Sequence, residues 1–356
     1  MHSFLRKIWV IVLGFIYLVA FFFALEIYCR FRLQYTDKHN MFVLGERRKA
    51  AAFSEAFEDS LWESIWDKYK KNVEVRQDID GTFFQIKMNS LGFRANEIRL
   101  PKPQGVFRVV CIGGSTTVEG PTNDTTYPAL LEKKLNRDFS NRRIEVFNCG
   151  ISSLTALGEK ERMPLYLKLE PDMIIEYNFV NDFARTLIPQ WWVSRRPWKI
   201  FLMRSLFLSE YFADYVFVSK KEVRNSINAL IIPNIKEMYE ECLRQKVKFV
   251  VCGFAAPDTS KISTREREYF DYNIKAFWDG KVNLQHYAEY VKIYNQCLEE
   301  FCRKNNIIFI PVQKYLSGGT DYFVDIAHLT PKGIEAKAEA IFQYLKVYLN
   351  DRSARQ

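Results

Sequence analysis

The stretch Arg108-Val-Val-Cys-Ile-Gly-Gly-Ser-Thr-Thr-Val-Glu-Gly120 decides how the rest of the chain is interpreted. Its apolar run Val109–Ile112 is followed at once by Gly113-Gly114, a pattern typical of a buried parallel strand that ends in a tight turn. Ligands of open α/β sheets bind at the carboxyl ends of such strands. Because glycine lets the backbone turn sharply, we expect Ser115 to face outward with its N–H directed toward a ligand.

Strands and helices alternate from residue 106 onward. Short apolar runs predict strands at Phe107–Ile112, Ile144–Asn148, Met173–Tyr177, Lys248–Gly253 and Ile307–Val312. Helices are predicted at Tyr127–Leu135, Thr155–Leu169, Val223–Gln245, Leu284–Lys304 and Lys332–Leu349. This alternation predicts a three-layer α/β/α sandwich with a five-stranded, doubly wound parallel sheet, in a domain that spans residues 106–350.

An N-terminal segment of different character precedes this domain. Ile8–Leu25 contains no charged side chain and is long enough, as a helix, to cross a bilayer core of roughly 30 Å. Trp9 and Tyr28 stand near the two interfaces, where aromatic rings are enriched. A cleavable signal peptide has a shorter apolar core and a small-residue cleavage site, which this segment does not offer. We therefore predict a short tail over 1–7 and a single N-terminal transmembrane helix, an uncleaved signal anchor, over 8–28.

Residues 29–105 form a membrane-proximal region in this interpretation. The spacing of apolar residues predicts an amphipathic helix over Glu46–Lys71. Alternation on both sides of Asp80-Gly81 predicts a hairpin over Val73–Met88.

The insertion at residues 189–219 is rich in aromatic residues and interrupts the alternation after the third predicted strand. Trp191, Trp192 and Trp198 interleave with arginine and lysine residues. Aromatic rings beside cations suit the headgroup layer of a membrane, so one interpretation is a cap over the site that leans on the membrane. The alternative is a lid packed over the domain's own core, and the sequence favours neither.

The composition is that of a globular protein, with 48% hydrophobic and 26% charged residues. The formal net charge of +9 is spread along the chain without a nucleic-acid-binding motif, so we expect no nucleic-acid partner. The seven cysteines are odd in number and lack the spacing of a disulfide framework. We expect Cys111, Cys149 and Cys252, in or beside predicted strands, to be small buried hydrophobic side chains.

Acyl transfer to a serine requires a base, a group that orients the base, and donors for the developing oxyanion. The chain has four histidines: His2, His39, His286 and His328. His2 and His39 adjoin the predicted span, and His286 begins a polar helix, where we expect it at the surface. His328 lies between the last predicted strand and the last predicted helix, at the sheet edge that also carries Ser115.

Asp325 precedes His328 by three residues and is therefore the candidate that orients it. A carboxylate on Nδ1 would fix the tautomer that leaves Nε2 free as base. The alternative interpretation of such a pair is a helix cap beside a surface histidine. Two further residues follow strands at the same edge: Gly150, whose N–H would face the site, and Asn181, whose amide would donate. Each is also common as an ordinary turn residue.

In this order, the four blocks resemble those of the SGNH hydrolases, the GDSL-like lipase and acylesterase superfamily. Gly113-Gly-Ser115 is similar to the first block, Gly150 to the second, Asn181-Asp182 to the third and Asp325-x-x-His328 to the fifth. The resemblance covers about residues 106–350, most of the chain. The first block reads Gly-Gly-Ser rather than Gly-Asp-Ser, a departure that leaves the nucleophile intact. In the third block Phe179 stands where a glycine is usual, so we expect an altered loop shape and a narrower pocket there.

The resemblance implies a fold, an activity and a set of roles. Ser115 would be the nucleophile, His328 the base and Asp325 its orienting residue. The oxyanion donors would be the N–H groups of Ser115 and Gly150 and the side chain of Asn181. No metal and no cofactor would be needed.

The leading hypothesis is a membrane-anchored serine esterase, with its catalytic domain on the extracytoplasmic side and an acylated small molecule, glycan or lipid as substrate. The same site could serve an O-acyltransferase that passes the acyl group to a carbohydrate hydroxyl instead of water. A catalytically silent binding protein with the same fold is the third hypothesis.

Overall fold

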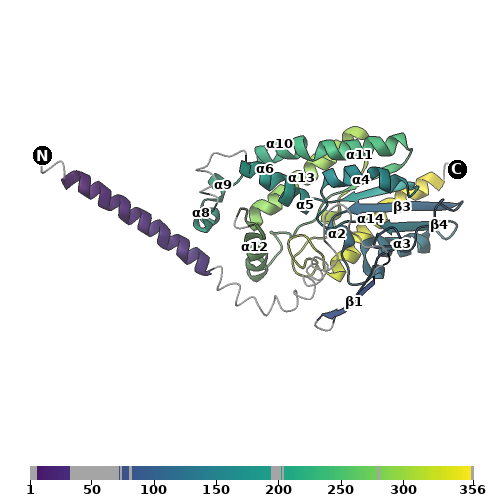
Figure 1. Cartoon of the computed structure of the whole chain (residues 1–356), viewed down its shortest axis with the longest axis horizontal. Helices are drawn as coiled ribbons and strands as arrows, with labels where there is room; N and C mark the ends of the chain where they lie inside the picture. Colours follow the sequence, from purple (N-terminus) through teal and green to yellow (C-terminus); the bar gives the residue numbers. More distant parts are fainter. Residues whose placement is uncertain are drawn as a thin grey trace.

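Figure 1 shows the computed structural model of the chain, which describes residues 6–32, 72, 74–79, 82–193, 202, 204–278 and 281–353. A helix over Arg6–Arg32 extends from one end of the domain (Figure 1). Its 27 residues, with a mean hydropathy of 2.8 in the most apolar 18-residue window, make it long and apolar enough to cross a membrane. The predicted helix Glu46–Lys71 lies outside the described residues.

The sheet of the domain has five parallel strands in the order β4-β3-β5-β6-β7. These strands span Val106–Gly113 (β3), Arg143–Asn148 (β4), Met173–Tyr177 (β5), Lys248–Cys252 (β6) and Ile308–Ile310 (β7). Val110 of β3 pairs with Phe147 on one side and Ile174 on the other. The order reverses between β3 and β5, and ligands of doubly wound sheets bind beside such a switch point. The predicted α/β fold class is confirmed.

Helices cover both faces of the sheet, which explains why its strands are continuous apolar runs. On one face α3 (Tyr127–Asp138) packs against α14 (Pro331–Ser353). The other face carries α4 (Ala156–Leu167), α10 (Lys220–Leu230), α11 (Ile232–Arg244) and α13 (Leu284–Asn305), as Figure 1 shows. Shorter elements are α2 (Ser115–Val118), η1 (Asn123–Thr125), α5 (Val180–Asp182), η2 (Phe183–Leu187), α6 (Ile188–Val193), α8 (Leu206–Tyr211), α9 (Ala213–Val216) and η3 (Val312–Lys314).

One helical prediction needs correction, and one helix was missed. The single helix expected over Val223–Gln245 is in fact the pair α10 and α11, which break at Ile231. Pro233 explains the break, because proline has no N–H to donate and is tolerated only in the first turn of a helix. Helix α12 (Thr264–Trp278) was not predicted.

The predicted hairpin is confirmed as β1 (Glu74–Ile79) and β2 (Thr82–Lys87), which pair in antiparallel register. It is attached to the loop after α2, because Asn123 exchanges two hydrogen bonds with the backbone of Lys87. Just beyond the hairpin, Met88 and Phe93 are buried. Residues 87–93 therefore pack against the domain that they precede.

The buried Arg94 connects this preceding segment to the residues that follow α2. Its guanidinium donates to the carbonyl oxygens of Val118 at 2.5 Å and Gly120 at 2.8 Å. A third bond, at 3.1 Å, goes to Asn123 Oδ1. These bonds fix the connection between α2 and η1.

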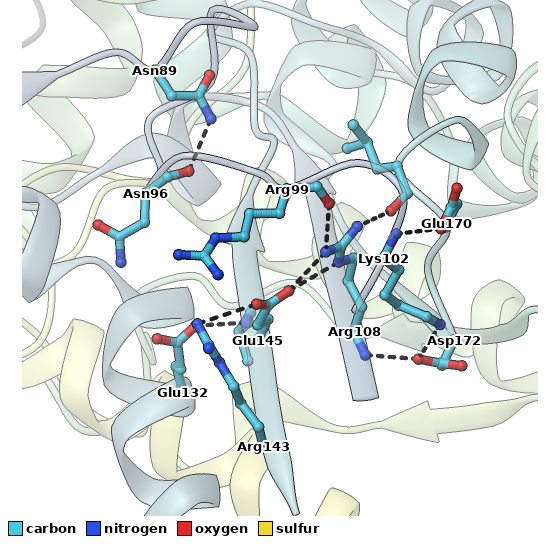
Figure 2. Close-up of polar contacts among 12 residues, drawn as sticks. Asn89, Asn96, Arg99, Lys102, Arg108, Glu132, Arg143, Glu145, Glu170 and Asp172 are labelled. Carbon is cyan, nitrogen blue, oxygen red and sulfur yellow. Dashed lines mark hydrogen bonds and ion pairs between the residues drawn. The ribbon is translucent and has the colours of Figure 1, made fainter. Parts of the chain in front are cut away.

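A second polar network lies at the amino ends of the strands (Figure 2). Buried Arg108 donates to Glu145 Oε2 at 2.9 Å and to the carbonyl oxygens of Leu169 and Arg99. Asp172 accepts from the Arg108 backbone at 2.7 Å and from Lys102 Nζ at 2.8 Å. These contacts hold the chain together at the end of the sheet opposite to Ser115.

The first part of the insertion at residues 189–219 packs against the domain. Trp191 is buried, donates from Nε1 to Ser226 Oγ at 2.9 Å and packs edge-on against Phe183 and Tyr290. This side chain therefore belongs to the domain core, as the lid interpretation expects, and does not contact a membrane. Trp198 lies outside the described residues, as does the side chain of Trp192.

Candidate active site

Three predicted residues form a hydrogen-bonded row at the carboxyl edge of the sheet. Ser115 begins α2 directly after β3, and His328 lies in the loop before α14. His328 Nε2 is 2.8 Å from Ser115 Oγ, and His328 Nδ1 is 2.7 Å from Asp325 Oδ2. Residues separated by 213 positions are thus brought together because both follow the edge at which the parallel strands end.

The loop geometry orients Asp325 before it orients the histidine. Asp325 Oδ1 accepts the backbone N–H groups of Ala327 and His328, each at 2.7 Å, while Oδ2 is directed at the imidazole. Burial alone would favour the protonated acid, but His328 and these two N–H groups hold the pKa of Asp325 below its ordinary value. The carboxylate is therefore charged and fixed when it meets Nδ1.

The same contact raises the basicity of His328. Burial disfavours the imidazolium, yet the adjacent Asp325 carboxylate, with a smaller contribution from Glu119, raises the pKa of His328 to about 9. A histidine paired in this way can accept a proton at Nε2 from a neighbouring hydroxyl.

The two glycines before Ser115 are required by close packing. Gly113 has φ of +155°, and an added Cβ there would clash with Thr117 Oγ1 and the Tyr177 carbonyl oxygen. An added Cβ at Gly114 would clash with Asn181 Nδ2. Glycine at the second position therefore lets the Asn181 amide approach the backbone beside Ser115.

Asn181 is half-buried in α5, and its Nδ2 lies 3.5 Å from Asn178 Oδ1. The neighbouring Asn178 is different, because its amide nitrogen already donates to Leu154 O at 2.7 Å and Glu159 Oε1 at 2.8 Å. Only Asn181 of these two asparagines faces Gly114 with its amide nitrogen.

Gly150 lies beside α2, where an added Cβ would come within 2.7 Å of Thr117 Cβ. Its N–H donates to Asn148 Oδ1 at 3.1 Å, an interaction that the sequence did not reveal. The amide nitrogen of Asn148 in turn donates to the Thr117 carbonyl oxygen at 2.9 Å. The Gly150 N–H would have to be shared with Asn148 in order to reach a ligand.

Phe179 does not have the effect expected of it at the glycine position. Its φ of −174° is extended backbone that any residue adopts, so the loop does not require glycine. The ring is fully buried and packs 4.5 Å from the ring of Tyr294 and 5.7 Å from that of Phe254, centroid to centroid. It fills the core beneath the loop, and the expected narrowing of the pocket by Phe179 is wrong.

Behind Asn181 lie three buried carboxyl groups, those of Glu159, Glu176 and Asp182. Asp182 accepts from the Ala156 N–H at 3.0 Å, which ties α5 to the start of α4. Burial raises the pKa of Asp182 to about 7, and burial together with mutual repulsion raises the pKa values of Glu159 and Glu176 well above their ordinary range. These groups are therefore largely protonated below neutral pH.

A buried ion pair that the sequence did not predict connects the segment after Ser115 to the loop that carries His328. Lys337 Nζ, on α14, donates to Glu119 Oε1 and to the Thr116 carbonyl oxygen, each at 2.6 Å. Glu119 Oε2 accepts the N–H of Leu329, the residue after His328, at 2.8 Å. The pair thus holds the segment after Ser115 against the loop of His328.

His286 is more enclosed than expected for a surface residue. Its Nε2 lies 3.3 Å from Asp214, and its ring packs edge-on against Phe217. The predicted burial of Cys111, Cys149 and Cys252 is confirmed. In the described part of the chain, no three His, Cys, Asp or Glu side chains are grouped in a way that could hold a metal ion.

Comparison with known proteins places this site in context. The sequence profile of the GDSL-like Lipase/Acylhydrolase family matches residues 111–336, a range that includes Ser115 and His328. No curated protein matches the sequence.

Several solved structures have a similar arrangement. TesA is 14% identical, with 67% of this chain and 98% of that chain covered and a TM-score of 0.42. The psychrotrophic esterase EstA from Pseudoalteromonas sp. is 13% identical, with 68% and 98% covered and a TM-score of 0.42. A catalytic mutant of Axe2, an acetylxylan esterase from Geobacillus stearothermophilus, is 13% identical, with 67% and 93% covered and a TM-score of 0.43.

Proposed function

Because the chain belongs to the GDSL-like lipase and acylhydrolase family, we propose that it is a serine esterase that cleaves carboxylic esters through an acyl intermediate on Ser115. The observation that supports this most directly is the 2.8 Å contact between His328 Nε2 and Ser115 Oγ, with Asp325 at 2.7 Å on the far side of the imidazole.

The proposed reaction has two steps, formation of the acyl-serine and its hydrolysis, and the same three side chains act in both. Neutral His328 accepts the Ser115 Oγ proton as the oxygen attacks the ester carbonyl, and the imidazolium then gives the proton to the leaving alcohol. Water, deprotonated by the same histidine, attacks the acyl-serine and releases the carboxylic acid, which restores the serine. Asp325 stays ionised throughout and stabilises the imidazolium.

The developing oxyanion would be bound by the N–H of Ser115 and by Asn181 Nδ2, with the Gly150 N–H as a third donor shared with Asn148. Donors fixed by packing before the substrate arrives lose no reorganisation energy at the transition state. Close packing of Gly114 against the Asn181 amide supports this role for Asn181.

The N-terminal helix would remain attached as a membrane anchor, with the catalytic domain on the extracytoplasmic side. Its last turns contact the domain, since Arg32 lies 3.1 Å from Glu210 and Glu26 accepts from Ser205 Oγ at 2.7 Å. A removed signal sequence would not be expected to make such contacts. Mass measurement of the mature protein tests retention, and protease accessibility of whole cells tests the side.

The proposed substrates are acyl esters of a carbohydrate, a glycolipid or a lipid, with short acyl groups such as acetyl among them. An O-acyltransferase would use the same acyl-serine but give the acyl group to a sugar hydroxyl. A panel of esters with graded chain length, assayed with and without sugar acceptors, separates these two activities.

The test variant is Ser115→Ala, and its matched control is Ser140→Ala, at an exposed serine in the turn that follows α3. We expect turnover to be lost only in Ser115→Ala. Full turnover in that variant would refute the esterase proposal, and absence of turnover in every protein would favour a silent binding role.

A further inference from the structure

The end of the N-terminal helix is docked on the second part of the insertion. Glu26 lies at the amino end of α8, where its carboxylate accepts the N–H groups of Leu206 at 3.2 Å and Phe207 at 3.1 Å. It also accepts from Ser205 Oγ at 2.7 Å. Three donors on one carboxylate fix the start of α8 relative to the helix.

Charged contacts extend this junction beyond Glu26. Arg30 donates to the Arg204 carbonyl oxygen at 3.2 Å. Glu210, on α8, lies 3.1 Å from Arg32 and 3.2 Å from Lys275 of α12. The same helix that would cross the membrane is therefore connected through α8 to the folded domain.

Aromatic side chains continue from the apolar helix onto the insertion. Phe22 packs edge-on against Phe207, with ring centroids 5.8 Å apart. Phe207 in turn packs against Tyr211 at 5.2 Å and Phe212 at 6.0 Å. Phe22 belongs to the uncharged run Ile8–Leu25, so this row of rings begins inside the segment that would lie in hydrocarbon.

Large side chains of α8 and α9 and of the residue between them are exposed. Tyr211 and Phe212 are 55% and 45% exposed, and Tyr215 of α9 is 85% exposed. Tyrosine and phenylalanine at the level where an apolar helix ends suit the membrane interface, because their bodies are apolar and the tyrosine hydroxyl reaches water or headgroups.

Helical geometry gives the depth of these aromatic residues relative to the bilayer. Glu26 directly follows the apolar run, and a helix rises about 1.5 Å per residue, so Phe22 lies only about 6 Å deeper than Glu26. The rings that contact Phe22 must therefore lie near the boundary between hydrocarbon and headgroups.

From these contacts we propose that α8 and α9 (Leu206–Val216) form a membrane-contact surface that lies on the headgroup layer of the bilayer crossed by the N-terminal helix. The proposal rests on the membrane anchor of the preceding subsection. The occupant is lipid, because the surface continues without interruption from the span itself. The domain would then be held in one orientation at the membrane and would not swing on a tether.

This orientation bears on how a substrate reaches the site. Figure 1 shows α2 and α5, which follow the carboxyl ends of β3 and β5, on the side of the sheet nearer to the N-terminal helix. The edge that carries Ser115 would thus be turned toward the membrane, which favours ester substrates that are themselves carried in or on the bilayer.

The test uses the full chain in nanodiscs, with an environment-sensitive fluorophore on a single introduced cysteine and lipids that carry a spin label near the headgroup. The cysteines of the described residues are buried, so the unsubstituted protein gives the labelling background. The probe positions are Tyr215→Cys on the proposed surface, Phe15→Cys within the span and Val347→Cys, exposed on α14. We expect the Tyr215→Cys probe to lose most of its fluorescence and the Val347→Cys probe to keep it.

The outcomes separate this proposal from the anchor on which it rests. Quenching at Phe15→Cys, by lipids labelled deep in the acyl chain, without quenching at Tyr215→Cys overturns the contact surface and leaves the anchor in place. Absence of quenching at both positions overturns both. In a second arm, Glu26→Ala should release Tyr215→Cys from quenching, whereas the matched Glu241→Ala on α11 should not. Quenching that survives Glu26→Ala overturns the docking role of that carboxylate.

Discussion

Replacing Lys337 by methionine tests the buried ion pair that joins the serine segment to the histidine loop. The Lys337 side chain is fully buried, its Nζ lies 2.6 Å from Glu119 Oε1, and it stands 4.5 Å from the ring centroids of both Tyr127 and Tyr177. Burial lowers the pKa of Lys337 and raises that of Glu119, while each opposes the shift of the other. Methionine keeps most of the volume but leaves Glu119 without its cation.

The expected cost is large because an unpaired buried charge remains. Breaking such a pair by removing one partner costs about 3–5 kcal/mol. For a domain of this size, a loss of that magnitude lowers the melting temperature by roughly 6–20 °C. The neutral double variant Lys337→Met/Glu119→Gln should recover much of the loss, because glutamine retains an oxygen for the Leu329 N–H.

The assay is thermal and urea unfolding of the two single variants and the double variant, followed by tryptophan fluorescence. The coupling energy from this cycle should be strongly favourable for the native pair. Losses below about 1 kcal/mol in both single variants would refute the reasoning, since that is the range of exposed ion pairs. Losses that simply add in the double variant would refute it as well.

Three further predictions concern the site. Asn181→Ala removes one fixed oxyanion donor and should lower kcat by about 10²–10³, with slower but persistent reaction of Ser115 toward a covalent probe; unchanged kcat would assign the donor role elsewhere. Since His328 must be neutral to act as base and its pKa is raised from 6.5 to about 9, kcat/KM should fall as the pH drops through a value above 6.5, and Asp325→Asn should move this limb to lower pH. Burial and the neighbouring Asp182 raise the pKa of Glu176, so folding favours its protonated form and the free energy of unfolding falls as the pH rises above 4.5. Glu176→Gln should therefore stabilise the protein at alkaline pH but not near pH 4.5, where the unfolded side chain titrates. Urea unfolding of both proteins at these two pH values measures the difference.

Local sequence patterns were sufficient to predict the fold and part of the site. The five strands were predictable because both faces of each are covered, which makes them short apolar runs. Asp325 and His328 were identified because only one histidine follows the last strand at the edge of Ser115. Pro233 is visible in the sequence, but the apolar periodicity continues on both sides of it, so one helix was predicted where there are two.

Other features could not be read from local patterns. Glu119 and Lys337 are separated by 218 positions and meet only when α14 packs against α3. The Gly150 N–H is engaged by Asn148 through a side-chain rotamer that spacing does not determine. Trp191 belongs to an insertion whose composition suits a membrane surface, and only its packing against Phe183 shows that its side chain lies in the core.

The central claim is that Ser115 is the nucleophile and that His328 activates it. A fluorophosphonate probe, with the labelled peptide identified by mass spectrometry, tests this on the full chain in detergent. We expect phosphonylation at Ser115 alone, and ester turnover reduced by roughly 10⁴ in Ser115→Ala and in His328→Ala, with little further loss in the double variant. Labelling at another residue, or near-normal turnover in a folded His328→Ala protein, would contradict it.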